Sequence, residues 1–168
     1  MHNDSLVKKL AHSVKLFDGL SDEDIREFLA NCLRRDIEPG EAVVTQGEYG
    51  QSMFVIVSGL MEVIREQDGL QQVLAVLEPG DLFGELAILD RQPRSATVRA
   101  VTSGLLLRFE RGSLARIPQV APKLIRNIAL ILSNRLRETY EMLLIPLSGN
   151  RKAPASEPAP SRHYRSRS

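Results

Sequence analysis

Short apolar runs separated by turn residues occupy the middle of the chain and constrain its fold more than any other feature. The runs are rich in β-branched residues, as strands are, and they cover residues 42–45, 53–57, 60–64, 73–77, 97–101 and 105–109. Turn sequences, each with a glycine, lie at residues 39–41, 46–50, 58–59, 67–69 and 102–104. Residues 67–69 and 102–104 each predict a hairpin. The pattern predicts an antiparallel jelly-roll β-barrel.

Helical patterns precede the predicted barrel. Apolar residues recur near the helical period from Leu6 to Phe17. Ser21 is followed by three acidic residues, which predicts an N-cap with an acidic first turn and a second helix that runs to about Cys32. We therefore expect two N-terminal helices in front of the strands.

A hinge and one long helix are predicted after the barrel. Pro122 can occupy the first position of this helix, whose broad apolar faces continue to roughly Leu144. Pro146 and Gly149 are the expected stop signals. Together with the strands, these helices predict an α+β fold that is mainly β.

The segment Phe83–Val98 combines the groups that a small phosphate ester needs. Gly84 has no Cβ, so a ligand can approach its backbone closely, and the next three residues predict a helical turn whose free N–H groups favour an anion. Arg94 can present a planar fork to two phosphate oxygens, and two small residues with accessible amides follow it. Glu85 fits beside a phosphate if it accepts hydrogen bonds from a sugar hydroxyl. Each half of the segment is a weak signal alone, and together they indicate phosphate chemistry.

This segment resembles, without a gap, the phosphate-binding cassette of the cyclic nucleotide-binding domain family, to which catabolite activator protein, protein kinase A regulatory subunits and cyclic nucleotide-gated channels belong. The resemblance implies that Glu85 holds the ribose 2′-hydroxyl, that Arg94 holds the cyclic phosphate, and that nearby backbone completes the site. The predicted ligand-binding residues are Phe83, Gly84, Glu85, Leu86, Ala87, Arg94, Ser95, Ala96 and Thr97. The resemblance covers about residues 5–145 and suggests a free-standing domain of bacterial type.

The expected ligand is a 3′,5′-cyclic mononucleotide. cAMP is favoured over cGMP because the sequence from Arg94 to Ala96 is similar to the bacterial cAMP receptor pattern, although Ser95 is compatible with either nucleotide. A cyclic dinucleotide receptor is one alternative. The other is a degenerate domain that serves as a protein-interaction scaffold, in which Glu85 is a solvated first-turn acid and Arg94 a surface arginine.

Two enzyme classes are disfavoured by the placement of the histidines. A metal-dependent cupin shares the jelly-roll architecture but needs clustered histidine ligands, and a phosphodiesterase also needs metal-binding histidines and carboxylates. His2, His12 and His163 all lie outside the predicted barrel. We therefore expect no metal site and no catalysis, with the ligand bound and not hydrolysed.

Composition predicts one domain followed by a tail. The chain has 168 residues, is 43% hydrophobic and carries a formal charge of +1, so it can bury a sizeable core and shows no global nucleic-acid signature. Cys32 is the single cysteine and is expected to be a structural thiol. We expect neither a signal peptide nor a transmembrane segment, hence a cytoplasmic protein. Residues 1–147 form the predicted domain, and residues 148–168 a disordered tail rich in proline, arginine and serine.

The expected output is a relay to an unidentified protein effector. Too few residues follow the long helix for a helix-turn-helix, so no DNA-binding domain is expected. Ligand binding would shift the helices after Phe109, with Leu114 and Ile117 as the hinge that the resemblance suggests. Polar residues near 134–139 could meet the base, or be solvated. A homodimer through the long helix is possible, since leucines at near coiled-coil spacing are Leu132, Leu136 and Leu143.

Overall fold

The structure is a computed structural model that describes residues 2–148, with side chains described for residues 7, 8 and 10–143. The chain divides into two units, residues 1–133 and 134–168, whose boundary lies within the last helix. The helices are α1 (His2–Ser13), η1 (Lys15–Phe17), α2 (Asp22–Ala30), α3 (Leu86–Leu89), η2 (Arg111–Arg116) and α4 (Ala121–Ser148). The strands are β1 (Cys32–Ile37), β2 (Ala42–Val44), β3 (Ser52–Ser58), β4 (Met61–Gln67), β5 (Leu70–Leu77), β6 (Leu82–Phe83), β7 (Thr97–Ala100) and β8 (Gly104–Glu110).

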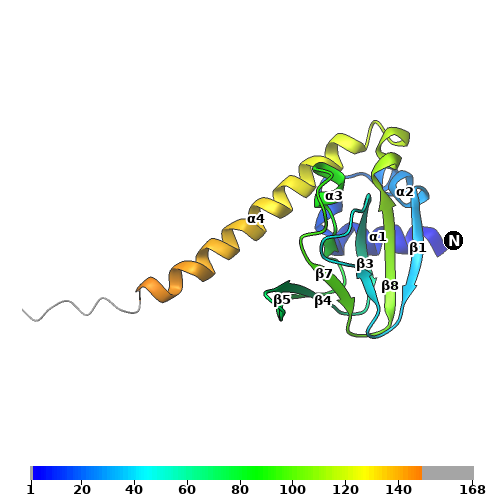
Figure 1. Ribbon diagram of the computed structural model, residues 1–168. Coiled ribbons are helices and arrows are strands. Elements are labelled where there is room, and N and C mark those ends of the chain that lie inside the picture. Colours follow the sequence, from blue (N-terminus) through cyan, green and yellow to red (C-terminus); the bar gives the residue numbers. More distant parts are fainter. Residues whose placement is uncertain (1, 149–168) are drawn as a thin grey trace, which may run out of the picture. The chain divides into compact units, whose positions relative to one another are not determined.

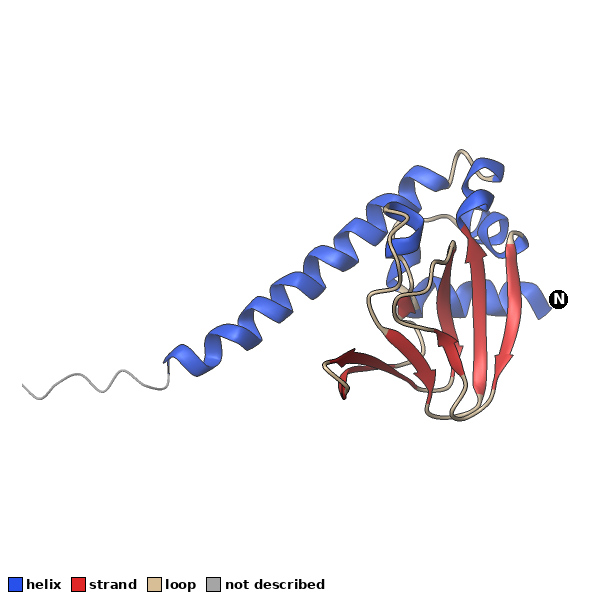
Figure 2. Ribbon diagram, viewed as in Figure 1, coloured by secondary structure: helices blue, strands red, loops and turns tan. Residues whose placement is uncertain are grey.

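The strands form two four-stranded antiparallel sheets, in the orders β1-β8-β3-β6 and β2-β7-β4-β5. Figure 1 shows β1, β8 and β3 running side by side, and Figure 2 shows the strands in red with the helices in blue. This is the predicted jelly-roll architecture, mainly β with flanking helices. The two sheets face one another without closing into a continuous barrel.

All six predicted strands are present, but the prediction missed β1 and β6. The expected helix to Cys32 is wrong at its end, because the helix stops at Ala30 and Cys32 begins β1. β1 has no apolar run that could reveal it, since Arg34, Arg35 and Asp36 occupy its centre. Burial raises the pKa of the Cys32 thiol to about 12, which keeps it protonated near neutral pH and agrees with a structural thiol.

One of the two predicted hairpins is confirmed and the other is wrong. β4 and β5 pair across the turn at residues 68–69, with Gln67 opposite Leu70. Residues 102–104 do not form a hairpin, because β7 pairs with β2 and β4 whereas β8 pairs with β1 and β3. The chain crosses between the sheets there, and Thr102 Oγ1 accepts a hydrogen bond from the Leu60 amide at 2.9 Å.

The helix starts are better predicted than the helix ends. Ser21 caps α2 in a capping box, with its hydroxyl accepting from the Asp24 amide at 3.1 Å and its amide donating to Asp24 at 2.9 Å. The helical pattern before it is split, since α1 ends at Ser13 and η1 follows. α4 continues through Pro146 to Ser148, beyond the predicted end. Gly149 and the rest of the predicted tail lie outside the described residues.

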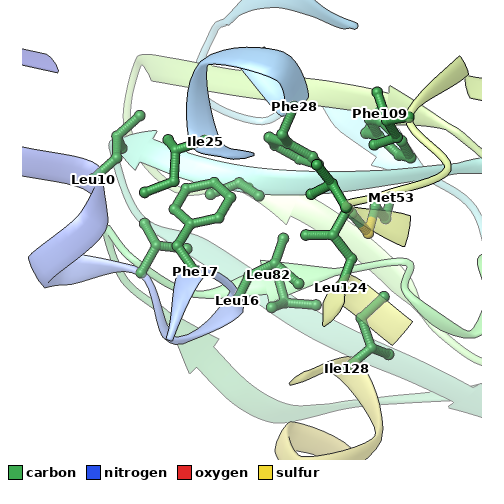
Figure 3. Close-up of a cluster of buried hydrophobic side chains, with 14 of the residues drawn as sticks. Leu10, Leu16, Phe17, Ile25, Phe28, Met53, Leu82, Phe109, Leu124 and Ile128 are labelled. Carbon is green, nitrogen blue, oxygen red and sulfur yellow. The ribbon is translucent and has the colours of Figure 1, made fainter. Parts of the chain in front are cut away.

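The largest apolar cluster lies between the first sheet and the helices, and we call it the helix-side cluster. Phe28 stacks on Phe109 at 4.8 Å between ring centroids and meets the edge of Phe17 at 5.2 Å (Figure 3). Its further fully buried members include Val7, Leu16, Ile25, Met53, Val55, Leu82, Ile117, Leu124 and Ile128. The first turns of α4 are therefore part of the core.

A second cluster, the inter-sheet cluster, fills the space between the two sheets. Its buried members are Ile37, Val43, Val44, Phe54, Ile56, Met61, Leu77, Phe83, Val98, Ala100 and Leu106. Along β3 and β8 the side chains alternate between the two clusters, as the period of two in a strand requires. Towards one end of these strands the inter-sheet face becomes polar, and the candidate site lies there.

Candidate functional site

Arg94 is held on both its backbone and its side chain by residues distant in sequence. Its amide donates to the Glu48 carbonyl at 2.8 Å, and its carbonyl accepts from the Gly47 amide at 2.9 Å. Its guanidinium donates from Nη1 to the Gly84 carbonyl at 3.1 Å and from Nη2 to the Ser52 carbonyl at 2.8 Å. These bonds use part of the five N–H groups of the guanidinium. Arg94 is thus preorganised between the loop before β3 and the turn at Gly84.

Burial lowers the pKa of the Arg94 guanidinium, because desolvation disfavours its charged form. The nearby carboxylates of Glu85 and Glu110 act in the opposite direction, and the like charge of Arg108 lowers the pKa further. The acceptors bonded to Arg94 are neutral carbonyls, which stabilise a cation less than a carboxylate does. An anion placed here would stabilise the guanidinium.

Gly84 brings the cassette backbone against Arg94. It has φ +73°, and a Cβ at this position would lie 2.7 Å from Nη1 of Arg94 and 3.0 Å from the Ser52 carbonyl oxygen. Both the conformation and the space exclude a side chain. Glu85 follows it, is 5% exposed, and precedes α3. The structure therefore brings Gly84, Glu85 and Arg94 together.

Two predicted site residues are buried beside the site. The Phe83 ring belongs to the inter-sheet cluster and stacks on Phe54 at 5.0 Å between centroids. Ala87 is buried in α3, and its carbonyl accepts from Nη1 of Arg111 at 3.3 Å. Its neighbour Ile88 enters the helix-side cluster. The cassette helix α3 is thus tied to the helix-side cluster and to η2, whereas Phe83 of β6 belongs to the inter-sheet cluster.

The remaining predicted residues lie nearer the surface. Leu86 is 40% exposed, Ser95 is exposed, and Ala96 is half-buried. Thr97 begins β7, and its hydroxyl accepts from the Gln46 amide at 3.0 Å. A ligand on this surface can therefore reach Ser95 and Ala96, which follow Arg94 in the chain.

A cavity of about 490 Å³ lies on one side of Arg94. Its walls come from β1, β2, β3, β8 and the loop at residues 45–51, and they include Arg35, Arg108 and Glu110. Of the nine predicted ligand residues, all of them described, Arg94 lines this cavity and the other eight do not. Arg35 pairs with Glu41 at 2.7 Å and Arg108 pairs with Glu110, so both cations are already compensated. The cavity and the cassette share one side chain, that of Arg94.

The sequence prediction missed the residues that hold Arg94. Ser52 supplies a carbonyl to it from 42 positions away, and Gly50 lies directly beside its guanidinium. The sequence around Gly47 and Gly50 was interpreted only as a turn. Two glycines three residues apart were the one available signal that another group packs against this loop.

A family model described as the cyclic nucleotide-binding domain matches residues 34–119, which contain the whole cassette and the loop that holds Arg94. The chain belongs to the cyclic nucleotide-binding domain family. Between residues 2 and 148, no group of three or more His, Cys, Asp or Glu side chains is arranged to hold a metal ion. None of the helices in this range is long and apolar enough to cross a membrane.

Relatives of this domain include bacterial and eukaryotic proteins. The cyclic AMP receptor protein of Thermus thermophilus is 36% identical over 124 residues, 73% of this chain and 57% of that protein. The cAMP-dependent protein kinase regulatory subunit of Mycosarcoma maydis is 36% identical over 138 residues, 81% of this chain and 26% of that protein. The crystal structure of Thermus thermophilus catabolite activator protein has a TM-score of 0.71 at 35% identity, over 80% of this chain and 63% of that one. The chain thus spans less than two thirds of each of these relatives.

Proposed function

We propose that this cyclic nucleotide-binding domain is a non-catalytic sensor of a 3′,5′-cyclic mononucleotide. The observation that carries the proposal is the partly buried Arg94 guanidinium, which donates hydrogen bonds to the neutral carbonyls of Gly84 and Ser52 and is disfavoured by its desolvation. A singly charged cyclic phosphate would offset that desolvation and accept charge-assisted hydrogen bonds. Glu85 would accept a bond from the ribose 2′-hydroxyl, and the exposed residues Leu86 and Ser95 would border the ligand.

The preferred ligand in this proposal is cAMP. Relatives whose names refer to cAMP include the Thermus thermophilus receptor protein and the Mycosarcoma maydis kinase regulatory subunit, and both are 36% identical to this chain. cGMP is the second candidate, because Ser95 is compatible with either nucleotide. A cytoplasmic location stays a prediction.

We infer that binding is relayed from the cassette to α4. Arg111 at the start of η2 donates to the Ala87 carbonyl of the cassette helix, so ligand contacts at α3 act directly on the hinge. Ile88 of α3 and Ile117 after η2 pack in the same helix-side cluster, and Leu114 lies against it. A ligand that favours one placement of α3 would therefore shift the population of conformations at the hinge and α4. The protein effector that senses this shift is not identified.

A homodimer through α4 is part of the proposal. Leu132 packs against the helix-side cluster, whereas Leu136, Tyr140 and Leu143 are each more than half exposed. These three residues follow the i, i+4, i+7 spacing of one helix face. A second copy of the same helix could cover this apolar stripe.

Isothermal titration calorimetry tests the proposed function. Nucleotide-stripped protein is titrated with cAMP, cGMP and a cyclic dinucleotide, with 5′-AMP as the control that lacks the cyclic ester. We expect micromolar or tighter binding of cAMP, weaker binding of cGMP and little heat with 5′-AMP. Heat with the dinucleotide alone would make the domain a cyclic dinucleotide receptor. The absence of heat with all four would favour the interaction scaffold.

A further inference from the structure

The loop before β3 wraps around Arg94. Gly47 and Glu48 hold the backbone of Arg94 through one hydrogen bond each, at 2.9 and 2.8 Å, and the Ser52 carbonyl accepts from its side chain at 2.8 Å. Gly50 lies between these contacts in the chain. The position of the guanidinium therefore depends on the shape of this loop as well as on the cassette.

Gly50 touches the guanidinium because it has no side chain. A Cβ at this position would lie 2.5 Å from Nη2 of Arg94, 2.8 Å from Nε and 2.9 Å from Cζ. Real carbon atoms do not approach these groups so closely. The guanidinium or the loop would have to shift, and a shift of the guanidinium would disturb its hydrogen bonds to the carbonyls of Ser52 and Gly84.

Gly50 is not required by its own backbone conformation. Its φ lies outside the left-handed region, in contrast to Gly84 at φ +73°. A substitution at Gly84 would therefore mix backbone strain with the steric effect on Arg94. A substitution at Gly50 changes the space beside the guanidinium alone, which makes this residue the cleaner probe.

We propose that Gly50 is a positioning residue for anion binding: its missing side chain lets Arg94 lie flat against the loop, with its remaining N–H groups directed at the anion. The inference rests on the proposed function, since it assigns the anion to Arg94. The neighbouring Ser52 anchors the same loop, because its hydroxyl donates to Glu110 at 2.9 Å and accepts from Arg108 at 3.0 Å. These bonds hold the end of the loop next to Gly50, so a methyl group there would press against the guanidinium.

The first test compares Gly50→Ala with Gly112→Ala by calorimetry against cAMP. Gly112 is the matched control, because a Cβ there would meet nothing within 4 Å and its φ is also outside the left-handed region. Both changes restrict the unfolded chain equally. We expect Gly50→Ala to weaken cAMP binding about 10- to 100-fold and Gly112→Ala to leave it within about twofold. Equal affinities for the two variants would overturn the proposal.

The second test needs no nucleotide. The melting temperature is measured for Gly50→Ala, for Arg94→Ala and for the double variant, each relative to the wild type. If the methyl group acts by displacing Arg94, Gly50→Ala lowers the melting temperature of the wild type and has almost no effect when Arg94 is already alanine. Equal losses in both backgrounds would mean that Gly50 serves the loop and not Arg94. This coupling can hold even if no cyclic nucleotide binds, so the two proposals fail separately.

Discussion

At one end of the sheet β1-β8-β3-β6, the same strands place opposite chemistry on their two faces. Met53 and Phe109 point into the helix-side cluster, where each is at most 1% exposed. On the other face, Ser52 and Arg108 form a polar network that reaches Arg94 through the Ser52 carbonyl. At this end of the strands, the helix-side face is buried and contributes to stability, whereas the opposite face carries arginines that line the cavity.

Because of this difference, we expect that stability and binding can be changed independently in this domain. Alternation with a period of two assigns neighbouring residues of one strand to different faces. A large change on the helix side should therefore unfold the domain without altering the affinity of the molecules that stay folded. A change at the polar end should do the reverse.

Phe28→Ala should have the largest effect on stability. The ring is fully buried between Phe17 and Phe109, so its removal leaves a cavity that costs about 3–5 kcal/mol in the free energy of unfolding. Urea denaturation checks the loss, and calorimetry at low temperature checks that the folded fraction keeps its cAMP affinity. Normal stability of the variant, or a weaker cAMP affinity of its folded fraction, would contradict the separate roles of the two faces.

Glu85→Gln should weaken cAMP binding about tenfold with little change in melting temperature. The change keeps the shape of the side chain and removes the charge that makes it a strong acceptor for the ribose hydroxyl. 2′-Deoxy-cAMP is the control ligand, because it lacks this hydroxyl. The affinities of the wild type and the variant for 2′-deoxy-cAMP should be similar. A tenfold difference with both ligands would assign Glu85 a structural role.

Lys123→Met should have the smallest effect, a loss below about 1 kcal/mol in the free energy of unfolding. Lys123 forms an ion pair with Asp24, and such pairs contribute little when they are partly exposed. Lys123 of α4 donates to Asp24 of α2 at 2.6 Å, and this hydrogen bond lowers the pKa of the Asp24 carboxyl. A lowered folded pKa contributes stability above the unfolded value of about 3.9, which is lost as the pH falls through the folded pKa. The difference in melting temperature between wild type and variant should therefore shrink from pH 6 to pH 3. A constant difference would show that the charge is unimportant.

Local features of the fold were predictable, and contacts between distant segments were not. The cassette is continuous in sequence, so Gly84, Glu85 and Arg94 could be grouped without a structure. Gly50 and Ser52 could not be assigned to Arg94, because the pairing of β3 with β6 brings them beside the cassette from a distant part of the sequence. Their roles depend on tertiary contacts, which local patterns in one sequence do not reveal.

The errors in strand assignment have the same origin. β1 has three charged residues in succession at its centre, Arg34, Arg35 and Asp36, so neither an apolar run nor an alternating pattern indicates a strand there. The turn at residues 102–104 has hairpin residues but joins two sheets, and only the pairing of β7 and β8 with other strands distinguishes these cases. Turn chemistry fixes a reversal of the chain and not the partner of each strand.

The most direct test of the account compares two arginines by calorimetry against cAMP. Arg94→Ala should reduce the affinity about 30- to 1000-fold, because it removes charge-assisted hydrogen bonds worth about 2–4 kcal/mol. Arg108→Ala, on the same polar face but paired with Glu110, should change it by less than about threefold. That contrast, with both variants folded, is the predicted result. Equal losses, or an unchanged affinity in Arg94→Ala, would contradict the assignment of Arg94 as the anion-binding residue.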